Sequence, residues 1–209
     1  MDKLLQEDQT GPRRIVAIGE CGLDYDLLHY ADKASQDAVF PLHFGLAQKY
    51  NLPMYFHSRG ADKEFYEIVS AHRGQFGRGV VHSFSSGKEP MLALVALDLY
   101  IGVSGASLRT LEQIEMVRAV PLDRLLVETD APYCELKGTH EGVKYVKSKF
   151  SKQKKEKYDP SKDTTVLVKD RNEPCTLIQI VEVVAALKGV EPHVIAQTTY
   201  ANTLLLFGI

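Results

Sequence analysis

Residues 14–20 read RIVAIGE, a short apolar run that closes on a carboxylate. Four further runs of this kind follow: LPMYFHS (52–58), GVVHSF (79–84), LYIGVSG (99–105) and LLVETDAP (125–132). Each run is rich in β-branched or aromatic residues and is almost continuously apolar, as is typical of strands buried on both faces of a parallel sheet. The sequence therefore predicts five parallel strands, each ending in a polar residue.

Segments with helical periodicity separate these runs. They cover residues 37–50, 64–73, 90–98 and 110–120, and two more helices are predicted over residues 175–189 and 193–207. The expected strand ends recur every 22 to 37 residues, which is the spacing of βα units. We therefore expect an α/β fold. A complete (β/α)8 TIM barrel has eight strands, so five strands predict an incomplete barrel.

The composition, 44% hydrophobic and 25% charged, is that of an ordinary globular domain. No apolar run approaches the ~18 residues that a membrane span needs, and the first residues lack the apolar core of a signal peptide. The three cysteines, Cys21, Cys134 and Cys175, are widely spaced and form no CxxC pair, which argues against a disulfide framework. We expect a protein of the nucleus or cytoplasm, or both, that does not contact membranes.

One polar stretch, residues 135–171, is expected to be an insertion within a single domain that covers residues 1–209. Its central part, residues 144–162, carries eight lysines against Glu156 and Asp159. Three interpretations remain open: a solvated flexible insertion, a surface that contacts phosphate groups, or a nuclear-import signal. The net charge of the whole chain, -2, predicts no general attraction to nucleic acid.

Glu20, His57, His82 and Asp130 lie at four of the expected strand ends. Active sites of parallel α/β folds form where the carboxyl ends of the strands meet. A single histidine there is more often structural than a ligand, but four candidate ligands at four strand ends favour a shared site. Carboxylates mixed with imidazoles suit Zn²⁺, Mn²⁺ or Mg²⁺. Cys21, one residue after Glu20, is expected to face the core.

The residues around these positions resemble the TatD family of metal-dependent deoxyribonucleases, which are TIM barrels of the metal-dependent hydrolase type. The matching motifs occur in the family's order: AIGECGLDYD (17–26), LPMYFHSR (52–59), GVVHSFSSG (79–87), YIGVSG (100–105), VETDAPY (127–133) and DRNEPC (170–175). The ECGLDYD, VKDRNEPC and lysine-rich segments are most similar to the eukaryotic branch of that family.

This resemblance implies a role for each candidate ligand. Glu20 would bridge two divalent metal ions (Mg²⁺, Mn²⁺ or Zn²⁺), and His57 and His82 would bind one of them. Asp130 would be a further ligand that orients or deprotonates the attacking water, so Glu20 and Asp130 would be the catalytic residues. Two such ions stabilise the attacking and leaving oxygens of a phosphodiester. The expected substrate is DNA, and the full-length enzyme is expected to be a monomer.

Four further residues are candidates for substrate binding. Arg59 could pair with a phosphate, or it could form an ordinary surface salt bridge. Asp24 and Glu173 could hydrogen-bond to ligands or metal-bound water, or could cap backbone amides. Tyr133 could stack on a base or pack at the rim of the site. Asn172 is predicted to cap the helix that follows it.

The family pattern begins with about three βα units that have no counterpart here, and these carry at least one more metal-binding histidine. We therefore expect the chain to be an N-terminally truncated form, with weak activity or none. Two alternatives to a DNase remain. One is a noncatalytic isoform that binds nucleic acid or partners through residues 144–162, and the other is an amidohydrolase acting on a small molecule. The second usually needs a lysine in a barrel strand, and none of the five predicted strands ends in or contains one.

Overall fold

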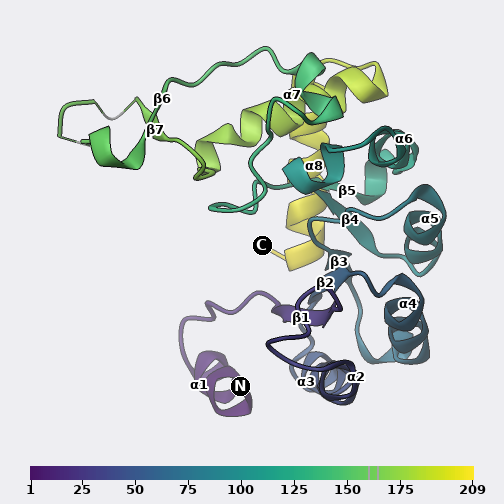
Figure 1. Cartoon of the computed structure of the whole chain (residues 1–209). Helices are drawn as coiled ribbons and strands as arrows, with labels where there is room; N and C mark the ends of the chain where they lie inside the picture. Colours follow the sequence, from purple (N-terminus) through teal and green to yellow (C-terminus); the bar gives the residue numbers. More distant parts are fainter. Residues whose placement is uncertain (160, 164) are drawn as a thin grey trace.

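The computed structural model describes residues 1–159, 161–163 and 165–209 (Figure 1). Its main sheet has five parallel strands in chain order, which confirms the predicted number and direction. The strands are β1 (Ile18–Asp24), β2 (Met54–Arg59), β3 (Gly79–Val81), β4 (Tyr100–Val103) and β5 (Leu125–Val127). This order is that of successive βα units in a TIM barrel, of which the chain forms an open part.

Helices precede, connect and follow these strands. They are α1 (Asp2–Thr10), α2 (Lys33–Val39), α3 (Leu42–Tyr50), α4 (Asp62–Ala71), α5 (Lys88–Ala96), α6 (Leu111–Ala119), α7 (Leu177–Lys188) and α8 (Pro192–Phe207). Short 3₁₀ helices complete the fold: η1 (Arg73–Gln75), η2 (Gly105–Leu108), η3 (Leu122–Arg124), η4 (Glu141–Tyr145), η5 (Lys155–Lys157) and η6 (Pro174–Thr176).

One predicted helix is in fact two. Residues 37–50 were expected to form a continuous helix, but α2 ends before Phe40 and α3 begins after Pro41. Proline has no backbone N–H, so it cannot continue the hydrogen-bond ladder of the preceding helix. It is tolerated at the start of a helix, which is where Pro41 lies.

The main core lies between the sheet and the helices that connect its strands. Phe56 of β2 lies at its centre, with ring centroids 5.9 Å from Phe40 and 5.7 Å from Phe65. All three rings are almost completely buried. Burying a phenylalanine side chain contributes roughly 1.5–3 kcal/mol, so this cluster is a major source of the stability of the sheet.

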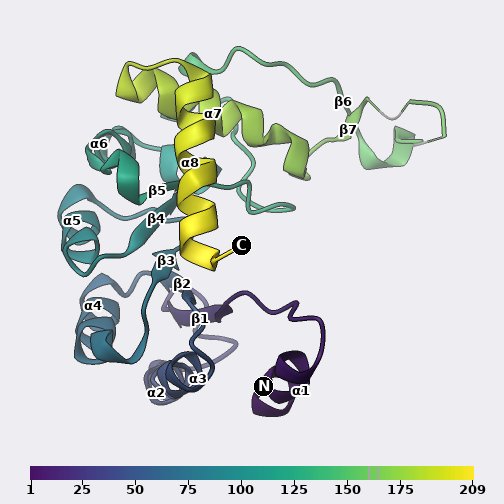
Figure 2. The ribbon, with the colours of Figure 1, turned by 180° about the vertical axis from the view of Figure 1, so that it is seen from behind.

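The opposite face of the sheet packs against the last helix. Val80, Tyr100 and Leu126, from β3, β4 and β5, form a second buried cluster with Leu206 of α8. In Figure 2, which views the molecule from behind, α8 crosses in front of these strands. The buried side-chain amide of Asn202 donates hydrogen bonds to the carbonyls of Leu122 and Leu125, both at 2.8 Å, which fixes α8 at the start of β5.

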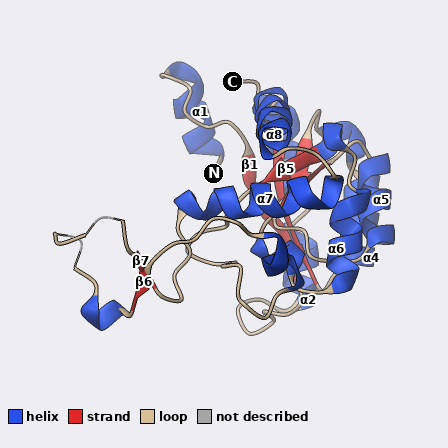
Figure 3. Cartoon of the chain, turned by 90° about the horizontal axis from the view of Figure 1, so that it is seen from above, coloured by secondary structure: helices blue, strands red, loops and turns tan. Residues whose placement is uncertain are grey.

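The lysine-rich segment projects from the body of the molecule (Figures 1 and 3). It holds a small second sheet in which β6 (Lys152–Gln153) pairs in parallel with β7 (Leu167–Val168). The insertion predicted over residues 135–171 includes positions 160 and 164, which lie outside the described residues. Among the described helices, none combines the length and apolar character that crossing a bilayer requires.

Candidate metal centre

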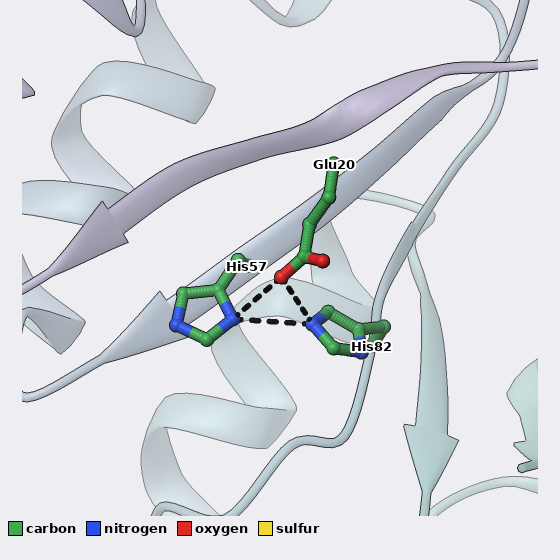
Figure 4. Close-up of side chains that lie close together, drawn as sticks. All are labelled: Glu20, His57 and His82. Atoms are coloured by element: carbon green, nitrogen blue, oxygen red, sulfur yellow. Dashed lines mark hydrogen bonds and ion pairs between the residues drawn. The ribbon is translucent and has the colours of Figure 1, made fainter. Parts of the chain in front are cut away.

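Three of the four predicted ligands converge on one point (Figure 4). Oε1 of Glu20 lies 2.9 Å from Nδ1 of His57 and 2.8 Å from Nε2 of His82. The two imidazole nitrogens are 3.1 Å apart. Two nitrogen lone pairs cannot face each other at this distance unless a proton or a cation lies between them. The donor set therefore fits a divalent cation, and two imidazoles with one carboxylate favour Zn²⁺ or Mn²⁺ over harder ions.

A β-bulge in β1 brings Glu20 to this point. Gly19 pairs with Tyr55 and Cys21 with the next residue, Phe56, so Glu20 is an extra residue in the ladder. The prediction that the strand ends at Glu20 is therefore wrong, because β1 continues to Asp24. A bulge re-aims the side chain at which it occurs. Glu20 turns toward His57, whereas Cys21 is buried in the core, as expected.

Gly22 allows β1 to approach β2 closely beside the site. A Cβ atom at this position would lie 1.9 Å from the carbonyl oxygen of His57, and the residue has φ +149°. Only glycine fits both the space and the backbone conformation. The glycine in the ECGLDYD motif is thus explained by the packing of the strand that carries His57.

Asp24, at the end of β1, holds the far side of the His57 ring. Its Oδ2 lies 3.0 Å from Nε2 of His57, and its side chain is only 18% exposed. A carboxylate bonded to the second nitrogen of a metal-binding histidine fixes the tautomer and orientation of the ring. The geometry places Asp24 where such a role is possible.

Sequence reasoning did not single out Glu128, which approaches His82 from the other side. Its Oε2 accepts a hydrogen bond from the Tyr55 hydroxyl at 2.7 Å and lies 3.7 Å from Nδ1 of His82. Its Oε1 accepts the backbone N–H of Ser83. At 3.7 Å the contact is an ion pair rather than a hydrogen bond, and Nδ1 of His82 has no hydrogen-bond partner among the described residues.

A glycine on β4 makes room for this carboxylate. A Cβ atom on Gly102 would lie 2.3 Å from Oε1 of Glu128 and 3.1 Å from the Cα atom of His82. Glu128 follows β5 directly and lies two residues before Asp130, so the alternation of side chains along an extended chain was the signal that could have found it.

The charges of the site stabilise one another. Hydrogen bonds from His57 and His82 hold the pKa of the Glu20 carboxyl far below its ordinary value. Burial opposes protonation of His82, yet the carboxylates of Glu128 and Glu20 outweigh it and raise the pKa of its imidazole to about 10. Burial, together with the charge of Glu128, also raises the pKa of Tyr55 far above its usual range. A cation that binds here must therefore displace a proton from His82.

Asp130 lies in the same cavity but outside the three-ligand group. Its Oδ2 accepts a hydrogen bond from the thiol of Cys134 at 3.0 Å. Burial and the neighbouring Asp130 carboxylate raise the pKa of this thiol, which keeps it protonated as a donor. Asp130 has φ +55°, a conformation that aspartate tolerates better than most residues.

The cavity around these groups measures about 1020 Å³. Its lining includes seven of the eight predicted site residues. One of them, Arg59, is cationic, and Arg109 and Lys137 add two further cationic side chains. Arg59 is paired with Asp26 at 3.0 Å, and Tyr133 is 72% exposed. Glu173 is not among the lining residues and instead pairs with Arg171 at 2.6 Å.

The prediction that Asn172 caps the following helix is wrong, because the N-cap residues of η6 and α7 are Glu173 and Thr176. Oδ1 of Asn172 accepts hydrogen bonds from Glu173 N–H and the Thr176 hydroxyl at the start of η6. Its side-chain amide donates to the carbonyls of Thr129 and Tyr133, both at 2.8 Å. One buried asparagine therefore ties the loop that carries Asp130 to the segment that precedes α7.

The family model for "TatD related DNase" matches residues 2–208. A "Putative deoxyribonuclease TATDN1 homolog" of Encephalitozoon cuniculi is 42% identical over 98% of this chain and 67% of its own length. The "Deoxyribonuclease Tat-D" of Schizosaccharomyces pombe is 38% identical over 92% of this chain and 62% of its own length. The chain thus spans about two thirds of the length of these relatives.

A solved structure, the "hydrolase TatD family protein from Entamoeba histolytica", superposes on the chain with a TM-score of 0.88. It is 34% identical, and the match covers 99% of this chain and 67% of that one. At this level of identity and overlap, the likeness extends to the arrangement of the sheet and helices throughout the chain.

Proposed function

We propose, from the premise that this chain belongs to the TatD-related DNase family, that it takes part in the hydrolysis of phosphodiester bonds in DNA. The observation that carries the proposal is the convergence of Glu20, His57 and His82 within a cavity that Asp130 and three cationic side chains also line. The name of the S. pombe relative supports DNA as substrate. The same name favours a nuclease over both the amidohydrolase and the noncatalytic alternative.

Glu20, His57 and His82 would hold the first cation, and Glu20 can bridge to a second one because a carboxylate has two oxygens. Asp130, across the cavity, would complete the set, so we propose two divalent ions drawn from Mg²⁺, Mn²⁺ and Zn²⁺. The chemistry that such ions supply is polarisation of the phosphate and a lowered pKa of bound water. Asp24 would orient the ring of His57, to which it is bonded, and Glu128 would act on His82 through its nearby negative charge.

Side chains of the protein would carry out the remaining steps of hydrolysis, which are proton transfer and substrate binding. Asp130 would accept the proton of the attacking water through Oδ1, since Oδ2 is already bonded to the Cys134 thiol. Arg59, at the mouth of the cavity, would balance the charge of the phosphate, and the exposed ring of Tyr133 would stack on a neighbouring base. For Glu173 we propose only an indirect role, through its pair with Arg171.

We further propose that the protein acts as a monomer in the nucleus or cytoplasm. Contacts with backbone phosphates carry little sequence information, so we expect no strong base preference.

The test is hydrolysis of DNA labelled at either end, with Mg²⁺, Mn²⁺ or Zn²⁺ and with EDTA. We expect metal-dependent cleavage that is weak, since the chain spans about two thirds of the length of its relatives. Glu20→Gln should reduce it by roughly 100-fold or more, because an amide neither bridges cations nor balances their charge. The matched control is Glu67→Gln, which changes an exposed carboxylate on α4 whose one ion pair among the described residues is with Lys63. Unchanged cleavage by the Glu20 variant would overturn the proposal, and the two labels separate exonuclease from endonuclease products.

A further inference from the structure

We propose that the lysine arm, defined here as residues 144–159, binds the phosphate backbone of the nucleic acid whose scissile bond enters the metal cavity. The arm would be a second binding surface, distinct from the groups that carry out hydrolysis. This inference rests on the proposed function for its choice of partner, but its binding step needs neither metal nor turnover.

The chain segments on both sides of the arm reach the cavity. Glu135 and Lys137, which precede it, line the cavity, and so does Asp170, which follows it. From this rim the chain runs outward, as two perpendicular views show (Figures 1 and 3). A strand of DNA that leaves the cavity on this side would therefore pass along the arm.

The root of the arm is fixed to the body by a buried carboxylate. Glu182 of α7 is 9% exposed and accepts hydrogen bonds from the backbone N–H groups of Lys147, at 2.8 Å, and Ser148, at 3.0 Å. The Ser148 hydroxyl donates a further bond at 2.5 Å. A carboxylate bonded to several donors holds a loop in one conformation.

The outer part of the arm is also tied down. Leu167 N–H donates to Ser151 O at 2.9 Å and Lys169 N–H to Gln153 O at 2.8 Å, which extends the β6–β7 pairing. Val168 of β7 is 4% exposed, so this strand is buried where it pairs with β6. In addition, the amino group of Lys152 contacts the carboxylate of Glu135, which lines the cavity. Strand β6 therefore lies against the cavity rim.

Beyond β6 the surface is cationic. Lys149, Lys154, Lys155 and Lys157 are exposed, and none of them forms an ion pair with another described residue. Of the nearby carboxylates, Asp159 is occupied by hydrogen bonds from Ser161 and by a pair with Lys162 at 3.1 Å. Its pKa is lowered by these contacts, so it stays ionised and bound. Glu156, between Lys155 and Lys157, offsets one of these charges, so the free charge of the arm is positive.

This pattern suits a phosphate backbone better than a folded protein partner. Lysine is a compact cation on a flexible stem, which follows a polyanion without demanding fixed geometry, whereas specific protein interfaces are depleted in lysine. The net charge of the chain is -2, so attraction to a polyanion is local to the arm rather than general. Local attraction at the rim would orient the substrate toward the cavity.

The test measures binding of fluorescent single-stranded DNA to the full chain in EDTA over a series of salt concentrations. The variant carries Lys154→Gln, Lys155→Gln and Lys157→Gln. The matched control carries Lys3→Gln, Lys63→Gln and Lys88→Gln, three exposed lysines of α1, α4 and α5 with the same change in net charge. Each phosphate contact contributes about 0.7 to the salt slope, so the arm variant should lower the slope by about 2 and weaken binding roughly tenfold.

The control should bind like the unmodified protein, and cleavage of a dinucleotide too short to reach the arm should be unchanged in the arm variant. Equal affinity and equal salt slope for the two triple variants would overturn the inference. So would a loss of binding to anionic lipid vesicles in the arm variant while its binding to DNA stays intact. The unmodified protein and both variants could all lack metal-dependent cleavage while the arm variant still binds DNA more weakly than the control. That result would count against the proposed function and leave this inference standing.

Discussion

The metal centre and the lysine arm place their charges in opposite ways. In the centre, Glu20, His57 and His82 are held within 3.1 Å of one another by a bulge, a neighbouring strand and a close glycine contact. In the arm, the backbone is fixed at the root and at the β6–β7 pairing, but the lysine side chains beyond them stand apart in solvent. Catalysis needs groups held in one geometry, whereas attraction to a polyanion needs only charge at the right place. Substitutions should therefore affect the two regions separately.

Among substitutions that leave the proposed ligands unchanged, the largest effect is expected from Glu128→Gln. Removing a carboxylate that orients a metal-binding histidine typically costs 10- to 100-fold in metal affinity. We expect a loss of this size for Zn²⁺ or Mn²⁺, measured by calorimetry, with DNA binding in EDTA unchanged. Glu115→Gln, an exposed carboxylate on α6, is the control. If DNA affinity fell as much as metal affinity, the metal centre and the lysine arm would not act separately.

The same carboxylate makes the stability of the metal-free protein depend on pH. The folded pKa of His82 is about 10, above its unfolded value of ~6.5, so its contribution is fully present below about pH 6.5 and is lost as the pH rises through 10. The urea midpoint in EDTA should fall between pH 6.5 and 10. Glu128→Gln should flatten this fall because it removes one of the two carboxylates that raise the pKa. An unchanged slope would show that Glu20 alone sets the proton affinity of His82.

A smaller effect is expected from Gly102→Ala, which tests the packing around Glu128. The new methyl group would meet Oε1 of Glu128, and inserting a methyl group into a packed interior costs about 1–3 kcal/mol. Gly45→Ala on α3 is the control, because a Cβ there meets nothing within 4 Å. Denaturant titration should show a loss for the first variant and a small gain for the second. Equal stability of the two would mean that Glu128 can move at little cost.

The smallest effect is expected from Glu182→Gln, which loosens the root of the arm. Burial raises the pKa of Glu182, but bonds from Ser148 and Lys147 lower it overall, so the carboxylate is ionised in the folded protein. The glutamine amide that replaces it would accept fewer of these bonds, which should lower the free energy of unfolding by about 1 kcal/mol. We expect DNA binding in EDTA to weaken only a few-fold and metal affinity to stay the same. Weaker metal binding would show that the arm and the centre are coupled.

Local sequence patterns were sufficient for the parts of the fold that depend on local chemistry. The five apolar runs predicted the five strands because burial on both faces leaves a continuous apolar stretch, as in GVV at residues 79–81. The break between α2 and α3 was missed although Pro41 marks it, because the apolar periodicity on both sides continues through the proline. The roles of Asp130, Arg59, Tyr133 and Glu173 remain predictions.

What the sequence by itself determined was the set of strands, their parallel direction and the residue types available to bind a cation. These follow from side-chain periodicity and from the chemistry of carboxylates and imidazoles, which each segment carries on its own. Only the tertiary structure decided that a bulge turns Glu20 toward His57 and that Gly102 leaves room for Glu128 beside His82. The same is true of the buried contact between Glu182 and the arm. Each of these contacts joins chain segments that lie far apart in the sequence. A local sequence pattern therefore cannot predict how closely the two segments approach.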